Sequence, residues 1–222
     1  MSDPTIFLLS TQTLPDALIA AAAGGRVQLD AMAFIRTEPV EEIGVLPRGP
    51  LTVVFTSQQA VGRLKGEGWR IFCTGGATRK LVSERFGEDA IAGTADSAED
   101  LARVIIGSGA GKAVTFFCGD QRREELPAML RKAGWLVDER IVYRTILQPQ
   151  KVSRRYDGIA FFSPSAVESF FSVNAADEAT VYFAIGRTTA AAVFARTGKE
   201  AMISNQPDKE VLIQQMIAHF KV

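Results

Sequence analysis

The feature of this sequence that most constrains its fold is an internal repeat. The stretch Thr74–Gly87 reads TGGATRKLVSERFG, and the stretch Ile185–Gly198 reads IGRTTAAAVFARTG. At an offset of 111 residues (186 − 75), nine identities line up without a gap: Gly75/Gly186, Thr78/Thr189, Val82/Val193, Arg85/Arg196, Gly87/Gly198, Ala90/Ala201, Glu99/Glu210, Leu101/Leu212 and Ile106/Ile217. This match predicts that the chain holds two copies of one unit.

Three more blocks support the duplication, in the same order and at almost the same offset. They are FTSQQAV over FFSPSAV (Phe55–Val61 and Phe161–Val167), LDAMAFIRT over VDERIVYRT (Leu29–Thr37 and Val137–Thr145), and Leu14-Pro15 over Leu126-Pro127. The whole chain is therefore predicted to be two copies of a unit of about 110 residues. A duplicated scaffold without a shared binding site remains an alternative interpretation of the repeat.

Strand-like runs alternate with helical stretches along the chain. The strand candidates are apolar almost throughout: TIFLLS, LTVVFTS, RIFCTG, AVTFFCG, GIAFFS and VYFAIG. Most precede a helical stretch: PDALIAAAA, TRKLVSERF, SAEDLARVII, EELPAMLRKAG, SAVESFF and TAAAVFART. This order is typical of parallel sheets covered by helices on both faces. Together with the repeat, it predicts an α/β fold of two similar domains, each a parallel sheet flanked by helices, with a cleft between them.

The composition argues against several classes of partner. Basic and acidic residues number 25 each, so no net charge attracts nucleic acid or an anionic membrane. No stretch approaches the roughly 20 apolar residues of a membrane-spanning helix, and the start MSDPTIFLLS lacks the basic region of a signal peptide. We therefore expect a cytoplasmic protein with no nucleic-acid or membrane partner.

The few histidines and cysteines restrict the chemistry. The only histidine, His219, is predicted to be the exposed end of the amphipathic stretch KEVLIQQMIAHF, which argues against a catalytic triad and a histidine-rich metal site. Cys73 and Cys118 each end a strand-like run and are predicted to be buried, reduced thiols. We expect neither a metal nor a cofactor.

The stretch GSGAGK (Gly107–Lys112) resembles a phosphate-binding loop but does not fit one. It is one residue short, alanine follows it, and it lies between a helix and a strand, whereas such a loop runs from a strand into a helix. It is therefore predicted to be a connection, which disfavours a nucleotide-using enzyme.

Each copy carries two polar turns between the end of a strand and the start of a helix. The serine turns hold Ser57 and Gln59 in the first copy, and Ser163 and Ser165 in the second; the glycine/threonine turns hold Gly75 and Thr78, and Gly186, Thr188 and Thr189. Ligands of open α/β sheets bind at this edge, and free N–H groups at a helix start favour anions. Helix capping by the hydroxyls is the alternative, but four equivalent turns favour a shared anionic ligand.

Several stretches resemble the uroporphyrinogen-III synthase family. They are FFCGDQRREELPAMLRKAGWLVDERIVYRT (Phe116–Thr145), AFFSPSAVESFF (Ala160–Phe171) and AIGRTTAAAV (Ala184–Val193), with VVFTSQQAV, TGGATRKLV and SAEDLARVI in the first half of the chain. The similarity covers nearly the whole chain in order.

The resemblance implies two α/β domains joined by two extended crossing segments, AFIRTEPV and VYRTILQPQ. One domain is expected to combine residues 1–35 with 148–222, and the other to be inserted as residues 39–145. The resemblance also implies an enzyme that cyclises hydroxymethylbilane to uroporphyrinogen III in haem biosynthesis, inverting ring D and losing water. It implies no cofactor and no metal, and we expect a monomer.

The resemblance also implies roles for individual residues. Tyr143 in VYRT matches a tyrosine proposed to assist loss of the hydroxyl, although packing within a strand is the alternative. The positions that match substrate contacts are Ser57, Gln59, Gly75, Thr78, Arg123, Ser163, Ser165, Gly186, Thr188 and Thr189. Gln59 departs from relatives that carry arginine there, and Arg123 is equally well explained as a solvated residue. A non-catalytic ligand-binding or regulatory module of the same fold remains the alternative function, which the presence of these residues disfavours.

Overall fold

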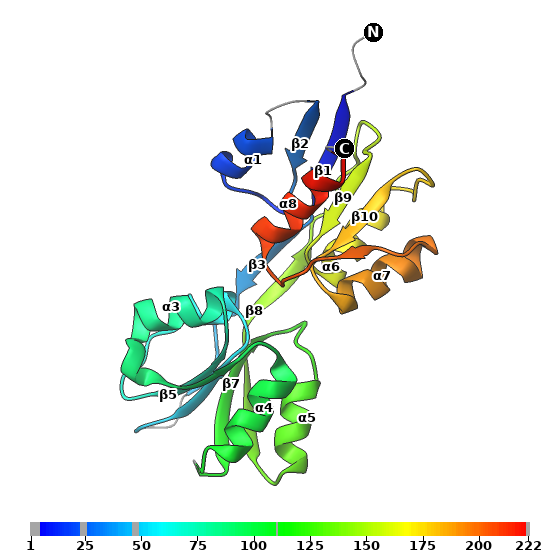
Figure 1. Cartoon of the computed structure of the whole chain (residues 1–222). Coiled ribbons are helices and arrows are strands. Elements are labelled where there is room, and N and C mark those ends of the chain that lie inside the picture. Colours follow the sequence, from blue (N-terminus) through cyan, green and yellow to red (C-terminus); the bar gives the residue numbers. More distant parts are fainter. Residues whose placement is uncertain (1–4, 23–25, 46–48, 110, 221–222) are drawn as a thin grey trace. The chain divides into compact units, whose positions relative to one another are not determined.

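The computed structural model describes residues 5–22, 26–45, 49–109 and 111–220. Helices and strands alternate along the chain (Figure 1). The chain divides into two compact units: unit 1 combines Met1–Arg36 with Ile146–Val222, and unit 2 is Thr37–Thr145. Each unit is built around one sheet with helices on both faces, which confirms the predicted α/β class.

The sheet of unit 1 has the strand order β11-β10-β9-β1-β2, and all of its pairs are parallel. The strands are β1 (Ile6–Ser10), β2 (Val27–Ala31), β9 (Gly158–Phe161), β10 (Val181–Ala184) and β11 (Met202–Ile203). Figure 1 shows α6 (Pro164–Phe171) and α7 (Arg187–Thr197) on one face, and α1 (Asp16–Ala22) and α8 (Lys209–Phe220) on the other. Neighbouring side chains of a strand point to opposite faces, so Leu9 packs in the core under α6 and α7 while Leu8 packs in the core under α1 and α8.

The sheet of unit 2 has the strand order β3-β8-β7-β4-β5-β6. The strands are β3 (Ile35–Pro39), β4 (Thr52–Phe55), β5 (Arg70–Thr74), β6 (Ile91–Ala95), β7 (Ala113–Gly119) and β8 (Leu136–Leu147). One core packs under α2 (Gln58–Val61) and α3 (Ala77–Phe86), and the other under α4 (Ala98–Gly107) and α5 (Glu125–Lys132); a short 3₁₀ turn, η1 (Glu88–Ala90), follows α3.

One strand pair departs from the predicted parallel arrangement. The N–H of Val40 donates to Val142 O at 3.1 Å, and the N–H of Gln148 donates to Phe34 O at 2.8 Å, so β3 and β8 run antiparallel. The chain passes from unit 1 to unit 2 along β3 and returns along β8. Two segments that lead in opposite directions and lie side by side can pair only in this way.

The sequence repeat reappears in the two sheets, but its copies are divided between the units. By the repeat, β4, β5 and β6 correspond to β9, β10 and β11, and β7 corresponds to β1. The long strand β8 corresponds to β2 in its first half and to β3 in its second half. Both sheets place these strands in the same order, with β3 as an addition to unit 2. Each unit therefore takes part of its sheet from the first copy and the rest from the second.

The isolated histidine and the two cysteines lie as predicted. His219 is exposed near the end of α8, and its ring contacts Phe183 edge-on at 5.6 Å between centroids. Cys73 and Cys118 are free and buried; burial raises the pKa of the Cys73 thiol to about 11 and that of Cys118 to about 12. Both thiols therefore stay protonated and unreactive near neutral pH.

The stretch Gly107–Lys112 is a connection, as predicted. It joins the end of α4 to the start of β7, and residue 110 lies outside the described residues. It therefore does not have the strand-to-helix setting of a phosphate-binding loop.

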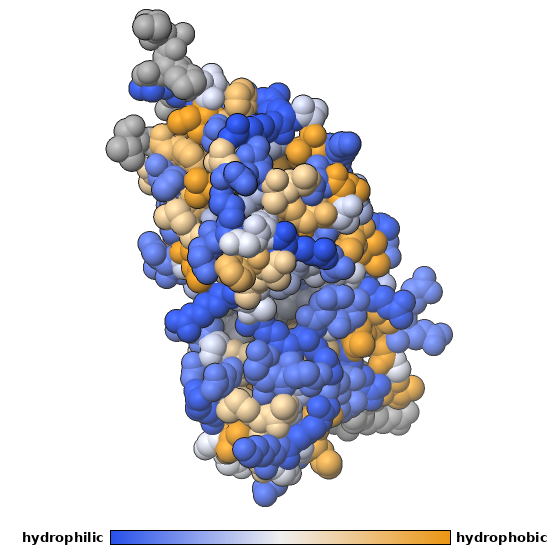
Figure 2. All heavy atoms as spheres, turned by 90° about the vertical axis from the view of Figure 1, so that its right-hand side faces the viewer, coloured by the Kyte–Doolittle hydropathy of each residue, from blue (hydrophilic) through white to orange (hydrophobic). Residues whose placement is uncertain are grey.

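Exposed apolar residues are scattered over the surface. On the face drawn in Figure 2, hydrophobic residues occur in small groups among hydrophilic ones. The most exposed large ones are Val45 in a loop, Leu136 on β8 and Phe194 on α7. Such isolated residues are ordinary in folded proteins. Within the described part of the chain, no helix is long and apolar enough to cross a membrane.

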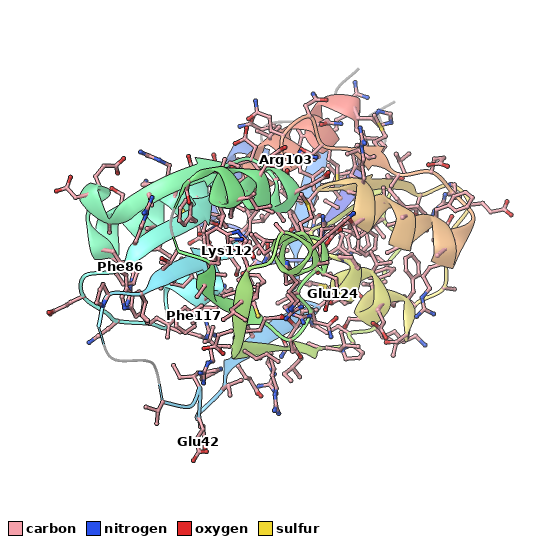
Figure 3. All side chains as sticks on the ribbon, turned by 90° about the horizontal axis from the view of Figure 1, so that it is seen from below. Glu42, Phe86, Arg103, Lys112, Phe117 and Glu124 are labelled. Atoms are coloured by element: carbon pink, nitrogen blue, oxygen red, sulfur yellow. The ribbon has the colours of Figure 1, made fainter. Side chains whose placement is uncertain are left out.

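Aromatic side chains fill one core of each unit. In unit 2, Phe86 and Phe117, both labelled in Figure 3, each stack with Phe55 and Trp69 at centroid distances of 5.4–6.1 Å. In unit 1, the ring of Phe161 lies 5.6 Å from that of Phe170, 5.8 Å from that of Phe171 and 6.3 Å from that of Tyr182.

Truncating Phe161 should therefore test the core of unit 1. Phe161 is 0% exposed, so Phe161→Ala removes a buried ring and leaves a cavity, and we expect it to lower the free energy of unfolding by about 3–5 kcal/mol. The matched control is Phe194→Ala on α7, where the ring is 49% exposed and the expected change is within about 0.5 kcal/mol. Denaturant titration of both variants measures the difference, and equal losses would contradict this account of the core.

Candidate functional site

The four polar turns lie at the carboxyl ends of neighbouring strands. In unit 2, the serine turn follows β4 and the glycine/threonine turn follows β5, and these strands pair directly. In unit 1, the corresponding turns follow β9 and β10, which also pair directly. Each unit therefore presents both of its turns at the same edge of its own sheet, where open α/β proteins bind ligands.

The serine turns are helix caps. Ser57 Oγ accepts a hydrogen bond from the N–H of Gln59 at 3.1 Å, and Ser163 Oγ accepts one from the N–H of Ala166 at 3.1 Å. Ser165 lies in the first turn of α6 and is 9% exposed. Helix capping therefore accounts for the position of Ser163, and packing in the first turn of α6 accounts for that of Ser165.

The glycine/threonine turns differ, because no side chain caps the helices that follow them. The N-cap residues are Gly76 before α3 and Gly186 before α7, and neither helix has a side-chain cap. The first-turn N–H groups of both helices therefore donate to no capping side chain, which is the setting in which helix starts bind anions.

The polar residues of these turns are not equally accessible. Thr78 and Thr189 lie in the first helical turns and are only 7% and 2% exposed, whereas Thr188 is exposed. The N–H of Gly75 already donates to Ala95 O at 2.8 Å. Thr188 and the helix N–H groups are thus better placed to meet a ligand than the hydroxyls of Thr78 and Thr189.

Tyr143 and Ser57, two of the predicted residues, are in direct contact. The Tyr143 hydroxyl donates a hydrogen bond to Ser57 Oγ at 3.0 Å. Ser57 comes from the turn after β4, and Tyr143 from the part of β8 beside the end of β7. A residue distant in sequence by 86 positions is thereby joined to the serine turn.

A bulge and a glycine position the ring of Tyr143. The register between β7 and β8 shifts after Cys118, which pairs with Ile141, so that Gly119 pairs with Tyr143. Bulges of this kind redirect the side chains that follow them. A Cβ atom at Gly119 would lie 2.5 Å from atoms of the Tyr143 ring. Gly119 therefore provides the space in which the phenol lies, a role that the sequence analysis did not predict.

Arg63 is a second residue that the sequence analysis missed. Its guanidinium carbon lies 5.6 Å from the centroid of the Tyr143 ring. Gln59, which was predicted as a site residue, accepts a hydrogen bond from Arg63 Nη1 at 2.8 Å and one from Thr37 Oγ1 at 3.1 Å. Arg63 lies in the turn just after α2, which ends at Val61, so no helical periodicity pointed to it in the sequence.

The surroundings of Tyr143 keep its hydroxyl protonated. Burial is the main cause that raises the pKa of Tyr143, and the nearby Cys118 and Asp120 act in the same direction. The hydrogen bond to Ser57 and the charge of Arg63 act against this rise. Near neutral pH, Tyr143 is thus a phenol that can donate a proton or a hydrogen bond.

Arg123 is not joined to this group by any described contact. It is exposed in the loop before α5. Its neighbour Arg122 instead pairs with Glu124 at 2.8 Å and also with Glu139. The exposure of Arg123 therefore agrees with the alternative interpretation, in which it is a solvated residue and not a substrate contact.

Among the described residues, histidine, cysteine, aspartate and glutamate side chains form no group that could hold a metal ion. The chemistry that the site offers is hydrogen bonding, proton donation by a phenol, and electrostatic contact with anions.

One protein family matches the chain over most of its length. A family model described as uroporphyrinogen-III synthase HemD matches residues 20–214. No match is found among curated protein sequences.

Two solved structures share the fold over nearly their whole length. Uroporphyrinogen-III synthetase from Helicobacter pylori has 15% sequence identity and a TM-score of 0.62, over 97% of this chain and 99% of that one. A mutant uroporphyrinogen III synthase from Thermus thermophilus has 15% identity and a TM-score of 0.64, over 97% and 98%. The family match over most of the chain decides the assignment: the chain belongs to the uroporphyrinogen-III synthase family.

Proposed function

We propose that Tyr143 and Ser57 form the proton-donating pair of the reaction that this family catalyses, and that the uncapped starts of α3 and α7 hold carboxylates of the substrate. Members of the family, this chain included, are cyclising lyases of haem biosynthesis that form uroporphyrinogen III. The substrate is hydroxymethylbilane, a linear tetrapyrrole with acetate and propionate groups. The observation that carries the proposal is the contact of Tyr143 Oη with Ser57 Oγ at 3.0 Å.

In the proposed reaction, Tyr143 gives its proton to the hydroxyl of the substrate as the C–O bond breaks. The oxygen leaves as water with the bonding electron pair, and the terminal pyrrole becomes an azafulvene electrophile. Ring D attacks this electrophile through the carbon that already carries its bridge to ring C. The old bridge bond then breaks and re-forms at the other α-carbon of ring D, which inverts the ring and closes the macrocycle. The proton that this carbon loses restores the phenol. The overall change is the loss of one water molecule, with protons in balance.

Ser57 is suited to support this step. Its Oγ accepts hydrogen bonds from Tyr143 Oη and from the N–H of Gln59. A serine hydroxyl also carries one proton of its own to donate. When Tyr143 has given up its proton, Ser57 can donate to the phenolate and stabilise the charge that has formed there.

The anionic groups of the substrate account for the starts of α3 and α7. The positive end of a helix dipole and its free N–H groups attract carboxylates. The exposed Thr188 hydroxyl is able to add a hydrogen bond at the start of α7. Orientation is the main requirement, because a free bilane closes without inverting ring D. The cytoplasmic location, the monomeric state, and the lack of cofactor and nucleic-acid partner remain predictions.

The products of the reaction test the function directly. Freshly made hydroxymethylbilane should be converted to uroporphyrinogen with isomer III in excess of isomer I, because the enzyme must invert ring D. The assay is run after exhaustive chelation and dialysis, since no metal is expected to take part. Chromatographic separation of the isomers provides the readout, and a product that consists of isomer I alone would exclude the function.

Tyr143→Phe tests the proton donor. The variant keeps the ring and loses only the hydroxyl, so we expect the fold to survive and turnover to fall about 10²–10⁴-fold, the usual contribution of general acid catalysis. Isomer III should still predominate in the product, because orientation depends on other groups. Burial raises the pKa of Tyr143, so the alkaline loss of turnover should lie above about pH 10 in the unaltered chain and disappear in the variant.

Tyr156→Phe is the matched control for this experiment. Its hydroxyl donates to Asp30 in unit 1 at 2.8 Å, so the change removes one tyrosine hydroxyl away from the proposed donor. Its turnover should stay near that of the unaltered chain. Near-normal turnover of Tyr143→Phe would contradict the assignment of Tyr143 as proton donor. The enzyme would then act by orienting its substrate.

Gly119→Ala tests how Tyr143 is positioned. The added methyl group would meet the Tyr143 ring and displace it, while the backbone at Gly119 has no positive φ that would exclude alanine. We expect a fall in turnover that approaches that of Tyr143→Phe, with the fold retained. Gly107→Ala is the control, since a Cβ there has no atom within 4 Å. Equal turnover of the two alanine variants would contradict the role of Gly119.

A further inference from the structure

Arg63 is a held cation beside the proposed proton donor. Its guanidinium carbon lies 5.6 Å from the centre of the Tyr143 ring. Nη1 donates to Gln59 Oε1 at 2.8 Å and to Gln59 O at 3.1 Å; Nη2 donates to Thr37 Oγ1 at 3.2 Å and to Thr37 O at 3.4 Å. Both terminal nitrogens of the guanidinium are therefore held by hydrogen bonds, Nη1 by Gln59 and Nη2 by Thr37.

The charge of Arg63 is not neutralised by a carboxylate among the described ion pairs of the chain. All of its hydrogen-bond acceptors are neutral oxygens of Gln59 and Thr37, and its Nε is buried without a hydrogen-bond partner. An arginine in a structural ion pair would have satisfied its charge locally. The positive charge of Arg63 can therefore act on the neighbouring Tyr143 phenol and on a ligand bound beside it.

The other groups around Tyr143 act in the opposite direction. Cys118 and Asp120, at and just after the end of β7, favour the neutral phenol, as does burial. Asp120 is itself held, because its Oδ1 accepts from the N–H of Thr145 at 2.9 Å. Of the charged residues that influence Tyr143, Arg63 is the one that favours the phenolate.

We propose that Arg63 is a positioning residue that makes the hydroxyl of Tyr143 a stronger acid, held in place by Gln59 and Thr37. This inference rests on the proposed function of Tyr143. When the phenol passes its proton to the departing hydroxyl of the substrate, the negative charge on Oη forms beside the guanidinium, which stabilises it. The proton returns from the attacking ring after closure, and Arg63 itself exchanges no proton.

Titration of Tyr143 in the full chain measures this effect without substrate. The sequence has three tyrosines, so labelling the ζ carbon of tyrosine with ¹³C yields one NMR signal each, and Tyr143→Phe identifies the signal of interest. Arg63→Met removes the charge at similar length. Arg70→Met is the matched control, because its guanidinium lies 5.7 Å from the ring of Phe72, which has no hydroxyl to titrate.

We expect the Tyr143 signal to titrate at higher pH in Arg63→Met than in the unaltered chain, and to be unchanged in Arg70→Met. Turnover of Arg63→Met should fall roughly tenfold, since general acid catalysis follows the strength of the acid. The same substitution should have no further effect in a Tyr143→Phe background. A merely structural role of Arg63 would slow both backgrounds alike.

Two results would overturn the inference: a Tyr143 titration that does not move in folded Arg63→Met, or an equal loss of turnover in both backgrounds. Failure of the proposed function has a different signature. In that case Tyr143→Phe would keep near-normal turnover, while the NMR titration would still report whether Arg63 controls the acidity of the hydroxyl.

Discussion

The pairing of strands from different copies of the repeat is the constraint on which the rest of the structure depends. In unit 1, β1 pairs with β9, and Leu8 lies beside Gly158 across 150 residues of sequence (158 − 8). A Cβ at Gly158 would lie 2.9 Å from Leu8 and 2.8 Å from Phe220, so glycine permits this close approach. In unit 2, β4 pairs with β7 in the same role. The loop that must close is longer in unit 1, which makes its core the entropically more demanding one to form.

These central pairings also determine where the chemistry lies. They bring the carboxyl ends of β7, β4 and β5 side by side in unit 2, so that Gly119, Tyr143 and Ser57 meet. The duplicated scaffold supplies polar turns to both units, but not the phenol: at the offset of 108 that aligns the two crossing strands, Ile35 stands where the second copy has Tyr143. The proposed proton donor therefore belongs to the second copy alone.

Much of the fold and part of the site could be predicted from the sequence. Apolar runs such as VYFAI identify strands because buried parallel strands need apolar side chains on both faces, and Ser57 and Ser163 are predictable at helix starts because a serine oxygen caps free N–H groups. The strand β6, IAGTA, has no such apolar run. It lies at the edge of the sheet and pairs with β5, so it forms a strand because β5 provides a partner and not because its own sequence indicates one. Arg63 escaped prediction because an arginine in a turn is usually a solvated residue, and its neighbours Thr37 and Tyr143 are distant in sequence.

The sequence by itself determined the class of fold, the duplication and the family, since these depend on periodicity and on residues that recur in order along the chain. The tertiary structure alone decided that each unit combines parts of both copies, that Thr78 and Thr189 are buried rather than capping, and that Gly119 makes room for Tyr143. These facts depend on which strands pair and in which register. A shift of one position between β7 and β8 changes where a side chain points, and such a shift results from packing contacts between distant segments that no local pattern records.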